Sequence, residues 1–152
     1  MLSKNAEYHK NTQLRDTQRS LPIALLRARE IVMSRFRPVL KKHKITEQQW
    51  RVLRVLTETG AIDATKIAEK SCILAPSLTR IIRTLEQRGL IKREKNRIDA
   101  RKLVLSITLQ GTALVEKVAP ESSGIYDQLE AEYGVKKTER LLDSLEELSK
   151  LK

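Results

Sequence analysis

Cysteine, histidine and glycine are scarce in this 152-residue chain, and each scarcity removes a class of function. The single cysteine, Cys72, excludes an intramolecular disulfide framework and a zinc site built from several cysteines. Two histidines and five glycines provide neither clustered metal ligands nor a glycine-rich phosphate loop, and no G-x-S-x-G motif is present. We therefore expect no catalytic residue, no metal and no cofactor, and we do not interpret the chain as an enzyme.

Long apolar runs are also missing, since runs such as Leu103-Val104-Leu105 are only a few residues long. A helix needs about 20 mostly apolar residues to cross a bilayer, so we expect no membrane partner. The first twenty residues lack both the apolar stretch of a secretion signal and a periodic apolar pattern. We expect a cytoplasmic protein in which residues 1–19 form a flexible arm and residues 20–152 a single domain.

Charge is present in excess and is unevenly distributed. The net charge is +11. Residues 80–102 carry nine Lys or Arg against three acidic residues, whereas residues 121–152 carry five against eight. A basic centre followed by an acidic end is typical of a protein that binds a polyanion through one surface. A run of charge is more often a solvated face, but here the basic run coincides with a structural motif.

Apolar residues at helical spacing predict a mainly α fold. Ser20 is a suitable N-cap for the first helix, which Pro38 should kink near its end. Thr46-Glu-Gln-Gln49 matches a capping box, and Gly60 should end the helix that it opens. Asp63 should cap a shorter helix that ends near Ser71.

The next segment changes from helical to strand periodicity. Pro76 suits the first turn of a helix that Gly89 should end. Residues 90–93 and 102–107 then predict two strands around a polar tip at residues 95–100. Thr108 should cap a further helix that Pro120 interrupts or bends. A last helix carries one apolar stripe: Leu141, Leu142, Leu145, Leu148 and Leu151.

This order of elements predicts a winged helix-turn-helix. A recognition helix fits the major groove of DNA and presents its N-terminal residues to base edges. On the helix that starts near Pro76, the candidate DNA-binding residues are Ser77, Thr79, Arg80 and Arg83. The hairpin or "wing" adds Lys92, Arg93, Lys95, Arg97, Arg101 and Lys102, which suit phosphates and the minor groove, and Asp99, which should hold Arg101 in a bidentate pair.

At these residues the chain resembles the MarR family of bacterial regulators. Asp99-Ala-Arg101 is similar to the D-x-R motif of the family's wing, and Leu105 to Gly111 is similar to its L-x-x-T-x-x-G motif, although leucine is usual where Ile107 stands. The resemblance covers roughly residues 20–150. It implies a homodimer that binds double-stranded operator DNA, with dimerisation helices at about 20–44 and 109–152 and a DNA-binding lobe at about 45–108.

Other segments resemble one subgroup of this family, the repressors of homoprotocatechuate degradation. They are Leu25–Glu30, Phe36-Arg-Pro38, Ile45–Arg51 and Cys72–Thr79. The resemblance implies repression of genes for aromatic-acid catabolism. The implied effector is a small aromatic carboxylic acid such as 4-hydroxyphenylacetate or 3,4-dihydroxyphenylacetate, with hydroxycinnamates as the alternative.

Several residues are candidates for binding such an effector. Arg29 stands on an otherwise apolar helix face, where a buried guanidinium needs a counter-charge from a carboxylate, from the chain itself, or from exposure at the surface. Trp50 either stacks on an aromatic ring or belongs to the core. The remaining candidates are Met33, Arg37, His43 and Cys72.

Two further interpretations stay open at this point. Cys72 is either an inert residue or a sensor of oxidants, and in the second case the effector would be an oxidant. A non-specific architectural protein would also be basic, but it would bind every duplex equally and would not respond to small molecules.

Overall fold

The computed structural model describes residues 14 and 16–152, and it divides the chain into two compact units, Met1–Arg35 and Phe36–Lys152. Most of the predicted N-terminal arm, residues 1–13 and 15, lies outside the described residues. Its described end contains a short 3-10 turn, η1 (Thr17–Arg19), in which the Asp16 carboxylate accepts a hydrogen bond from the Gln18 N–H at 2.7 Å. No pattern in the sequence predicted this turn.

Helix α2 (Leu21–Lys42) begins directly after Ser20, as predicted, and continues past Pro38 for a further turn. Only Phe36 and Leu40 of this helix are buried, and both belong to the second unit. Among the helices of the described chain, none is long and apolar enough to span a bilayer.

The second unit contains the predicted helix-turn-helix. Helix α3 (Glu47–Thr59) starts with the complete Thr46–Gln49 capping box and ends at Gly60. Asp63 caps α4 (Ala64–Ser71) by accepting from the Lys66 N–H at 2.9 Å. Helix α5 (Ala75–Gln87) carries proline in its first turn, and Gly89 follows it in the left-handed region at φ +69°. These boundaries confirm the predictions to within one or two residues.

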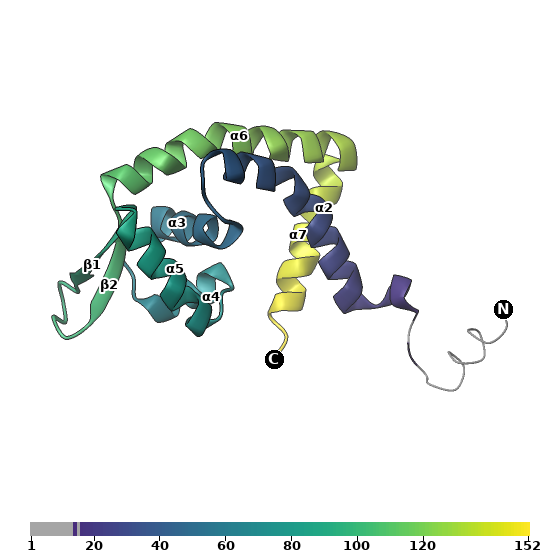
Figure 1. The fold of residues 1–152 in the computed structure, drawn as a ribbon. Helices are drawn as coiled ribbons and strands as arrows, with labels where there is room; N and C mark the ends of the chain where they lie inside the picture. The colour runs from purple at the N-terminus through teal and green to yellow at the C-terminus, as the bar shows by residue number, and fades with distance from the viewer. Residues whose placement is uncertain (1–13, 15) are drawn as a thin grey trace, which may run out of the picture. The chain divides into compact units, whose positions relative to one another are not determined.

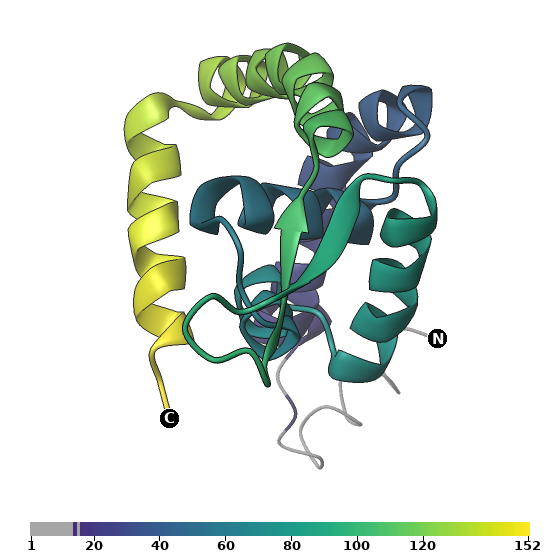
Figure 2. The same cartoon turned by 90° about the vertical axis from the view of Figure 1, so that its left-hand side faces the viewer.

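The wing is an antiparallel hairpin of β1 (Ile91–Lys95) and β2 (Leu103–Ile107) (Figures 1 and 2). In its register Arg93 lies opposite Leu105. Lys95 belongs to the strand and not to the tip where it was predicted. Leu105 also exchanges two backbone hydrogen bonds with Ile62, at 2.8 and 3.1 Å. These bonds fix the hairpin to the segment that precedes α4.

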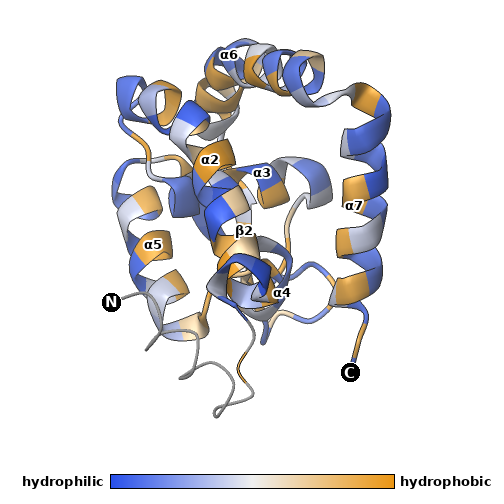
Figure 3. Ribbon diagram, turned by 90° about the vertical axis from the view of Figure 1, so that its right-hand side faces the viewer, coloured by the Kyte–Doolittle hydropathy of each residue, from blue (hydrophilic) through white to orange (hydrophobic). Residues whose placement is uncertain are grey.

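Two C-terminal helices follow, α6 (Leu109–Tyr133) and α7 (Val135–Ser149). Pro120 does not interrupt α6, so that part of the prediction is wrong; proline removes one backbone donor, and a helix of 25 residues retains enough other hydrogen bonds to continue. Helix α7 has no buried residue in the single chain, and apolar residues recur along its ribbon, coloured orange in Figure 3. Leu151 lies beyond the end of the helix.

The core of this unit lies where α3, α4 and α5 contact one another and the hairpin. Its fully buried side chains come mainly from the inner faces of the three helices: Val52, Leu53, Leu56, Ile67 and Leu85. Arg88, at the end of α5, donates to the Lys44 carbonyl oxygen at 2.7 Å and so ties the helix to the α2–α3 connection. Trp50 of α3 is buried together with Leu53 and Leu56.

The start of α6 meets the end of α5 at a tight junction. The Thr108 hydroxyl donates to the Gly89 carbonyl oxygen at 2.6 Å and accepts from the Gly111 N–H at 3.0 Å. A Cβ added to Gly111 would lie only 2.1 Å from the Leu90 carbonyl oxygen. The contact atom is backbone, so a side chain here would force the helix and the strand apart.

We therefore expect Gly111→Ala to lower the free energy of unfolding by about 1–3 kcal/mol, the usual cost of overpacking a close-packed site. Gly124→Ala is the matched control, because it lies in the same helix and its added Cβ meets no atom within 4 Å. It should raise the free energy of unfolding by about 0.5–1 kcal/mol. Urea denaturation at one fixed protein concentration measures both, and equal effects would contradict the junction's role.

Candidate nucleic-acid interface and ligand pocket

Helix α5 separates its residues into a buried and an exposed side, as a recognition helix requires. Leu78, Ile81, Ile82 and Leu85 are buried, whereas Thr79, Arg80 and Arg83 are exposed and Ser77 is half-buried. The Thr79 hydroxyl donates to the Ala75 carbonyl oxygen at 3.2 Å, which leaves its oxygen as an acceptor on the surface. The guanidinium groups of Arg80 and Arg83 are thus available to bases or phosphates.

The turn between α4 and α5 sets where the recognition helix begins. Cys72 caps α4 in the left-handed conformation at φ +52°, which turns the chain sharply. One Arg51 nitrogen donates to the carbonyl oxygens of Ser71 at 2.9 Å and of Cys72 at 3.2 Å. The arginine therefore satisfies acceptors that the end of α4 leaves open, and it ties α3 to this turn.

The tip of the wing is a turn that several hydrogen bonds hold in place. The Asn96 side-chain oxygen accepts from the N–H groups of Ile98 and Asp99, at 2.8 and 3.2 Å. The Asn96 N–H donates to the Lys102 carbonyl oxygen at 2.9 Å, and the Lys102 N–H donates to the Asp99 carbonyl oxygen at 3.0 Å. Asn96 lies within the predicted tip but was not assigned a role there, although an asparagine in a polar tip is a recognised signal for such a turn.

The predicted bidentate pair between Asp99 and Arg101 is wrong in detail. One Asp99 oxygen accepts the backbone N–H of Arg101 at 3.1 Å, and the guanidinium Nε lies 3.5 Å from the same oxygen. The Arg101 side chain is 94% exposed. Aspartate prefers local backbone donors in turns, so Asp99 shapes the tip and leaves the arginine projecting into solvent.

Not all basic residues of the wing are equally available. The Nε of Arg93 lies 2.8 Å from a carboxylate oxygen of Glu86 on α5, and this hydrogen bond and the charge of Glu86 raise the pKa of Arg93. Lys92 lies 3.4 Å from Glu94. By contrast Lys95, Arg97 and Lys102 are exposed around the tip. The tip is therefore the part of the wing best suited to meet phosphates.

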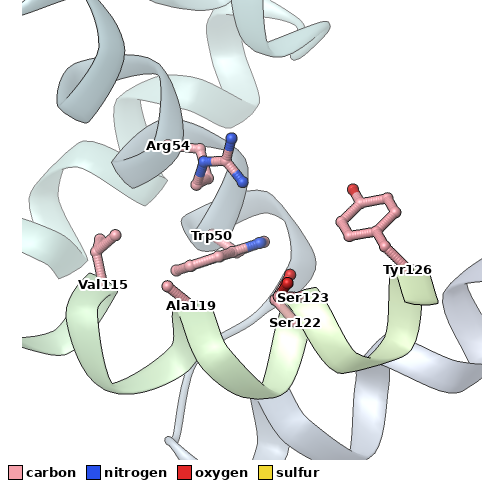
Figure 4. Close-up of a pocket in the computed structure, with 7 residues that line it drawn as sticks. All are labelled: Trp50, Arg54, Val115, Ala119, Ser122, Ser123 and Tyr126. Carbon is pink, nitrogen blue, oxygen red and sulfur yellow. The ribbon is translucent and has the colours of Figure 1, made fainter. Parts of the chain in front are cut away.

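A pocket of about 210 Å³ lies between α3 and α6 (Figure 4). Trp50 forms its base, and Arg54 lies over the indole with its guanidinium carbon 5.9 Å from the ring centroid. The guanidinium of Arg54 also forms a salt bridge, with its Nη2 2.8 Å from a carboxylate oxygen of Glu58. The other lining residues come from α6: Val115, Ala119, Ser122, Ser123 and Tyr126. An aromatic face, a cation and hydroxyl groups therefore converge on one space.

Sequence reasoning found Trp50 but missed Arg54 and Tyr126. Arg54 stands four residues after Trp50, one helical turn away on the same face, and this spacing is the signal that could have identified it. Tyr126 lies far away in the sequence, and only the fold brings it to the pocket. Its ring also contacts Phe36 edge-on, with the centroids 5.1 Å apart.

Arg37 and Cys72, two other predicted ligand residues, do not line this pocket. The guanidinium of Arg37 is paired with Glu47, with Nε 2.5 Å from a carboxylate oxygen. Cys72 is exposed on the connection before α5 and does not line the pocket. Arg29 and Met33 belong to the first unit, and Arg29 is exposed in the single chain, which is one of the alternatives that the sequence left open.

His43 is neither an exposed loop residue nor a lining residue of the pocket. Its Nε2 lies 2.7 Å from a carboxylate oxygen of Glu121, and its side chain is mostly buried. Lys42 donates to both oxygens of the same carboxylate at 3.1 Å. The hydrogen bonds from His43 and then Lys42 lower the pKa of Glu121. The cluster fastens the end of α2 to α6, one residue before the pocket's serines.

The fold and the exposed basic surface define a winged helix-turn-helix DNA-binding protein. The sequence profile of the MarR family matches residues 45–103. The homoprotocatechuate degradative operon repressor of Escherichia coli is 45% identical over 128 residues, which cover 84% of this chain and 86% of that protein. The chain belongs to the MarR family of transcriptional regulators.

Two solved structures are informative neighbours. NadR in complex with 4-hydroxyphenylacetate is 40% identical and superimposes with a TM-score of 0.80, covering 91% of this chain and 99% of NadR. The transcriptional repressor CouR, bound to a 23-mer DNA duplex, is 26% identical with a TM-score of 0.79, covering 90% and 99% of the two chains. The mainly helical winged fold predicted from the sequence is confirmed.

The Glu121 carboxylate gives a testable pH dependence. A carboxylate whose pKa is lowered on folding stabilises the folded state above its ordinary pKa of 4.5, and this contribution is lost as the pH falls through the lower, folded value. We therefore expect Glu121→Gln to be less stable than wild type at neutral pH, with a difference that shrinks below pH 4.5.

Urea denaturation from neutral pH to about pH 3 measures this difference. Glu116→Gln, an exposed position on the same helix, controls for the loss of one negative charge. A stability difference for Glu121→Gln that stays constant across the whole pH range would contradict the role of the carboxylate.

Proposed function

We propose that this chain is a homodimeric repressor of an aromatic-acid catabolic operon and that a phenolic acid releases it from its operator. The pocket between α3 and α6 carries the proposal, because it joins an aromatic face and a cation directly to the helices that position the recognition helix. The relationship to the Escherichia coli repressor and to NadR, whose structure contains 4-hydroxyphenylacetate, supports the choice of ligand.

On the DNA side, α5 enters the major groove and the wing meets the backbone and minor groove. Ser77, Thr79, Arg80 and Arg83 contact bases and neighbouring phosphates from the first turns of α5. From the wing, Lys95, Arg97, Arg101 and Lys102 contact phosphates or the minor groove, and Asp99 contributes by shaping the tip. The CouR complex supports this use of the fold, since that relative is bound to duplex DNA.

Dimerisation accounts for the apolar side chains that the single chain leaves in solvent. Leu141, Leu142, Leu145 and Leu148 of α7 are all exposed, and Leu21, Leu25 and Leu26 of α2 are exposed as well. Apolar stripes of this size on helices are normally covered by a partner. We therefore propose dimerisation through residues of about 20–44 and 109–152, with residues of about 45–108 as the DNA-binding lobe acting in the cytoplasm.

In the pocket, the ligand's ring stacks on Trp50 while its carboxylate pairs with the guanidinium of Arg54. The hydroxyls of Ser122, Ser123 and Tyr126 are available to a phenol at the other end of the ligand. This assignment moves the carboxylate partner from Arg29 to Arg54. Arg37, His43 and Cys72 contribute from outside the lining of this pocket, and Arg29 and Met33 contribute from the first unit.

Release from DNA follows from a shift between two populations of the dimer. A ligand between α3 and α6 favours the arrangement of the dimer in which these helices make the best contacts with the ligand. Because α3 also contacts α4 and α5, this arrangement affects the position of the recognition helix. A dimer binds half-sites one helical turn apart, so a changed spacing of the two recognition helices weakens binding. A ligand with equal affinity for both arrangements would have no effect.

The alternatives make different demands on the protein. An oxidant sensor would act through Cys72, which is exposed. A non-specific architectural protein would have no use for the pocket. An enzyme would turn over the phenolic acid, and turnover by the purified protein would contradict the binding role that we propose.

The first test measures binding of the full chain to its own upstream intergenic DNA and to a scrambled duplex at one fixed, near-physiological salt concentration. Each is measured with and without 4-hydroxyphenylacetate or 3,4-dihydroxyphenylacetate. We expect binding to the upstream DNA to be tighter by at least about 1,000-fold without ligand, and to weaken when either acid is added.

Equal binding to both duplexes would favour the architectural alternative. Selective binding to the upstream DNA that neither acid affects would contradict the proposed identity of the effector. Cys72→Ser is the control for oxidant sensing, and it should respond to the acids as the wild type does.

A second test separates Arg54 from Arg29. Arg54→Gln should raise the acid concentration that half-releases the operator by about tenfold or more, because a hydrogen bond to a charged group contributes about 1.5–3 kcal/mol. Glu58→Gln removes the carboxylate that competes for Arg54, and it should lower that concentration. Arg29→Gln is the matched control. A loss of response in Arg29→Gln alone would restore the assignment made from the sequence.

A further inference from the structure

The most exposed large apolar side chain described in this chain lies at the tip of its wing. Ile98 is 98% exposed, between Arg97 and Asp99. Within the hairpin the other exposed large apolar residue is Leu103, at 56%. Leu103 lies on the same strand face as the buried Leu105, because alternate residues of a strand share a face, so it continues the core side. Ile98, by contrast, does not extend the apolar core of the protein.

The position of Ile98 is fixed by hydrogen bonds. Its own N–H donates to the Asn96 side-chain oxygen at 2.8 Å, and the neighbouring Asp99 N–H donates to the same oxygen at 3.2 Å. The turn is closed by the Asn96 N–H, which donates to the Lys102 carbonyl oxygen at 2.9 Å. The hydrogen-bonded backbone holds the Ile98 side chain away from the protein, whereas a side chain on a loop without such bonds can fold back onto it.

The surroundings of Ile98 indicate what it meets. Lys95, Arg97, Arg101 and Lys102 are exposed around it, and the Arg101 side chain is 94% exposed. A protein partner with an apolar patch would have to desolvate these cations. The minor groove of DNA has phosphates along both rims and apolar sugar surfaces along its walls, and it is only about 6 Å wide. A basic ring around one apolar side chain is complementary to that arrangement.

We propose that Ile98 is a specificity-determining residue that inserts into the minor groove and packs against sugars and base edges, while the surrounding cations bind the flanking phosphates. This inference rests on the proposed binding of operator DNA. The amino group of guanine occupies the floor of the groove, so the isoleucine favours A·T pairs where the wing enters. Apolar side chains of other architectures contact DNA from the minor groove in a comparable way.

The test compares Ile98→Ser, Ile98→Val and Leu103→Ser in the full chain, binding to the upstream operator and to a scrambled duplex. Ile98→Ser should weaken operator binding about tenfold, the size expected when most of one buried aliphatic side chain is lost. Its slope of log K against log salt should equal that of wild type, since no charge changes. Ile98→Val should stay within about twofold of wild type, and Leu103→Ser should not reproduce the loss.

A modified duplex identifies the groove. Inosine–cytosine pairs present the major-groove pattern of G·C but lack the minor-groove amino group. At the base pairs that hydroxyl-radical footprinting places beneath the wing, wild type should bind the inosine duplex more tightly than the G·C duplex. Ile98→Ser should lose most of that preference.

The outcomes are distinguishable. Equal binding of wild type to operator and scrambled DNA would contradict the proposed function itself. Selective wild-type binding that Ile98→Ser leaves unchanged, or a loss that Leu103→Ser shares, would overturn the role of Ile98 alone. A preference for inosine that survives in Ile98→Ser would assign the groove contact to another residue and also overturn it.

Discussion

The approach of α6 to the backbone of Leu90 determines where the wing and the recognition helix stand relative to each other. Gly111 has no Cβ to separate the helix from the Leu90 carbonyl oxygen, and Thr108 bonds to both Gly89 and Gly111. Three parts of the regulator therefore meet at one point: the end of α5, the start of β1 and the long helix α6. Under the proposed function, a ligand that displaced α6 would act on the DNA-reading elements through this contact, because close-packed interiors transmit strain.

Much of the fold could be predicted because local signals and tertiary structure agree. The capping box at Thr46 and the cap at Asp63 mark helix starts through hydrogen bonds between side chains and nearby backbone N–H groups. The glycine after α5 marks a helix end, and all three signals involve only neighbouring residues. The prediction that the helix is interrupted at Pro120 failed for a physical reason. Pro120 weakens a helix locally, but α6 continues through it. Helix propensity gives the free-energy cost of one residue in a helix, but it does not include the stabilisation that the other residues of the helix provide.

The candidate site was less predictable for the same reason. The basic surface of α5 and the wing is a local property, and the sequence shows it directly. The pocket depends on which residues of α6 lie opposite α3, and no local pattern connects Tyr126 with Trp50. His43 was a candidate for ligand binding, and in the single chain its Nε2 lies 2.7 Å from a carboxylate oxygen 78 residues away in the sequence. Pairings between distant charges require the fold to be known.

The position of Trp50 has a practical consequence. It is the only tryptophan in the chain, and it forms the base of the pocket beneath Arg54. The tryptophan fluorescence of this protein therefore originates at the same place where an aromatic acid would stack. Emission can be followed without a label and without DNA, so occupancy of the pocket and release of the operator are accessible as two separate signals from one unmodified molecule.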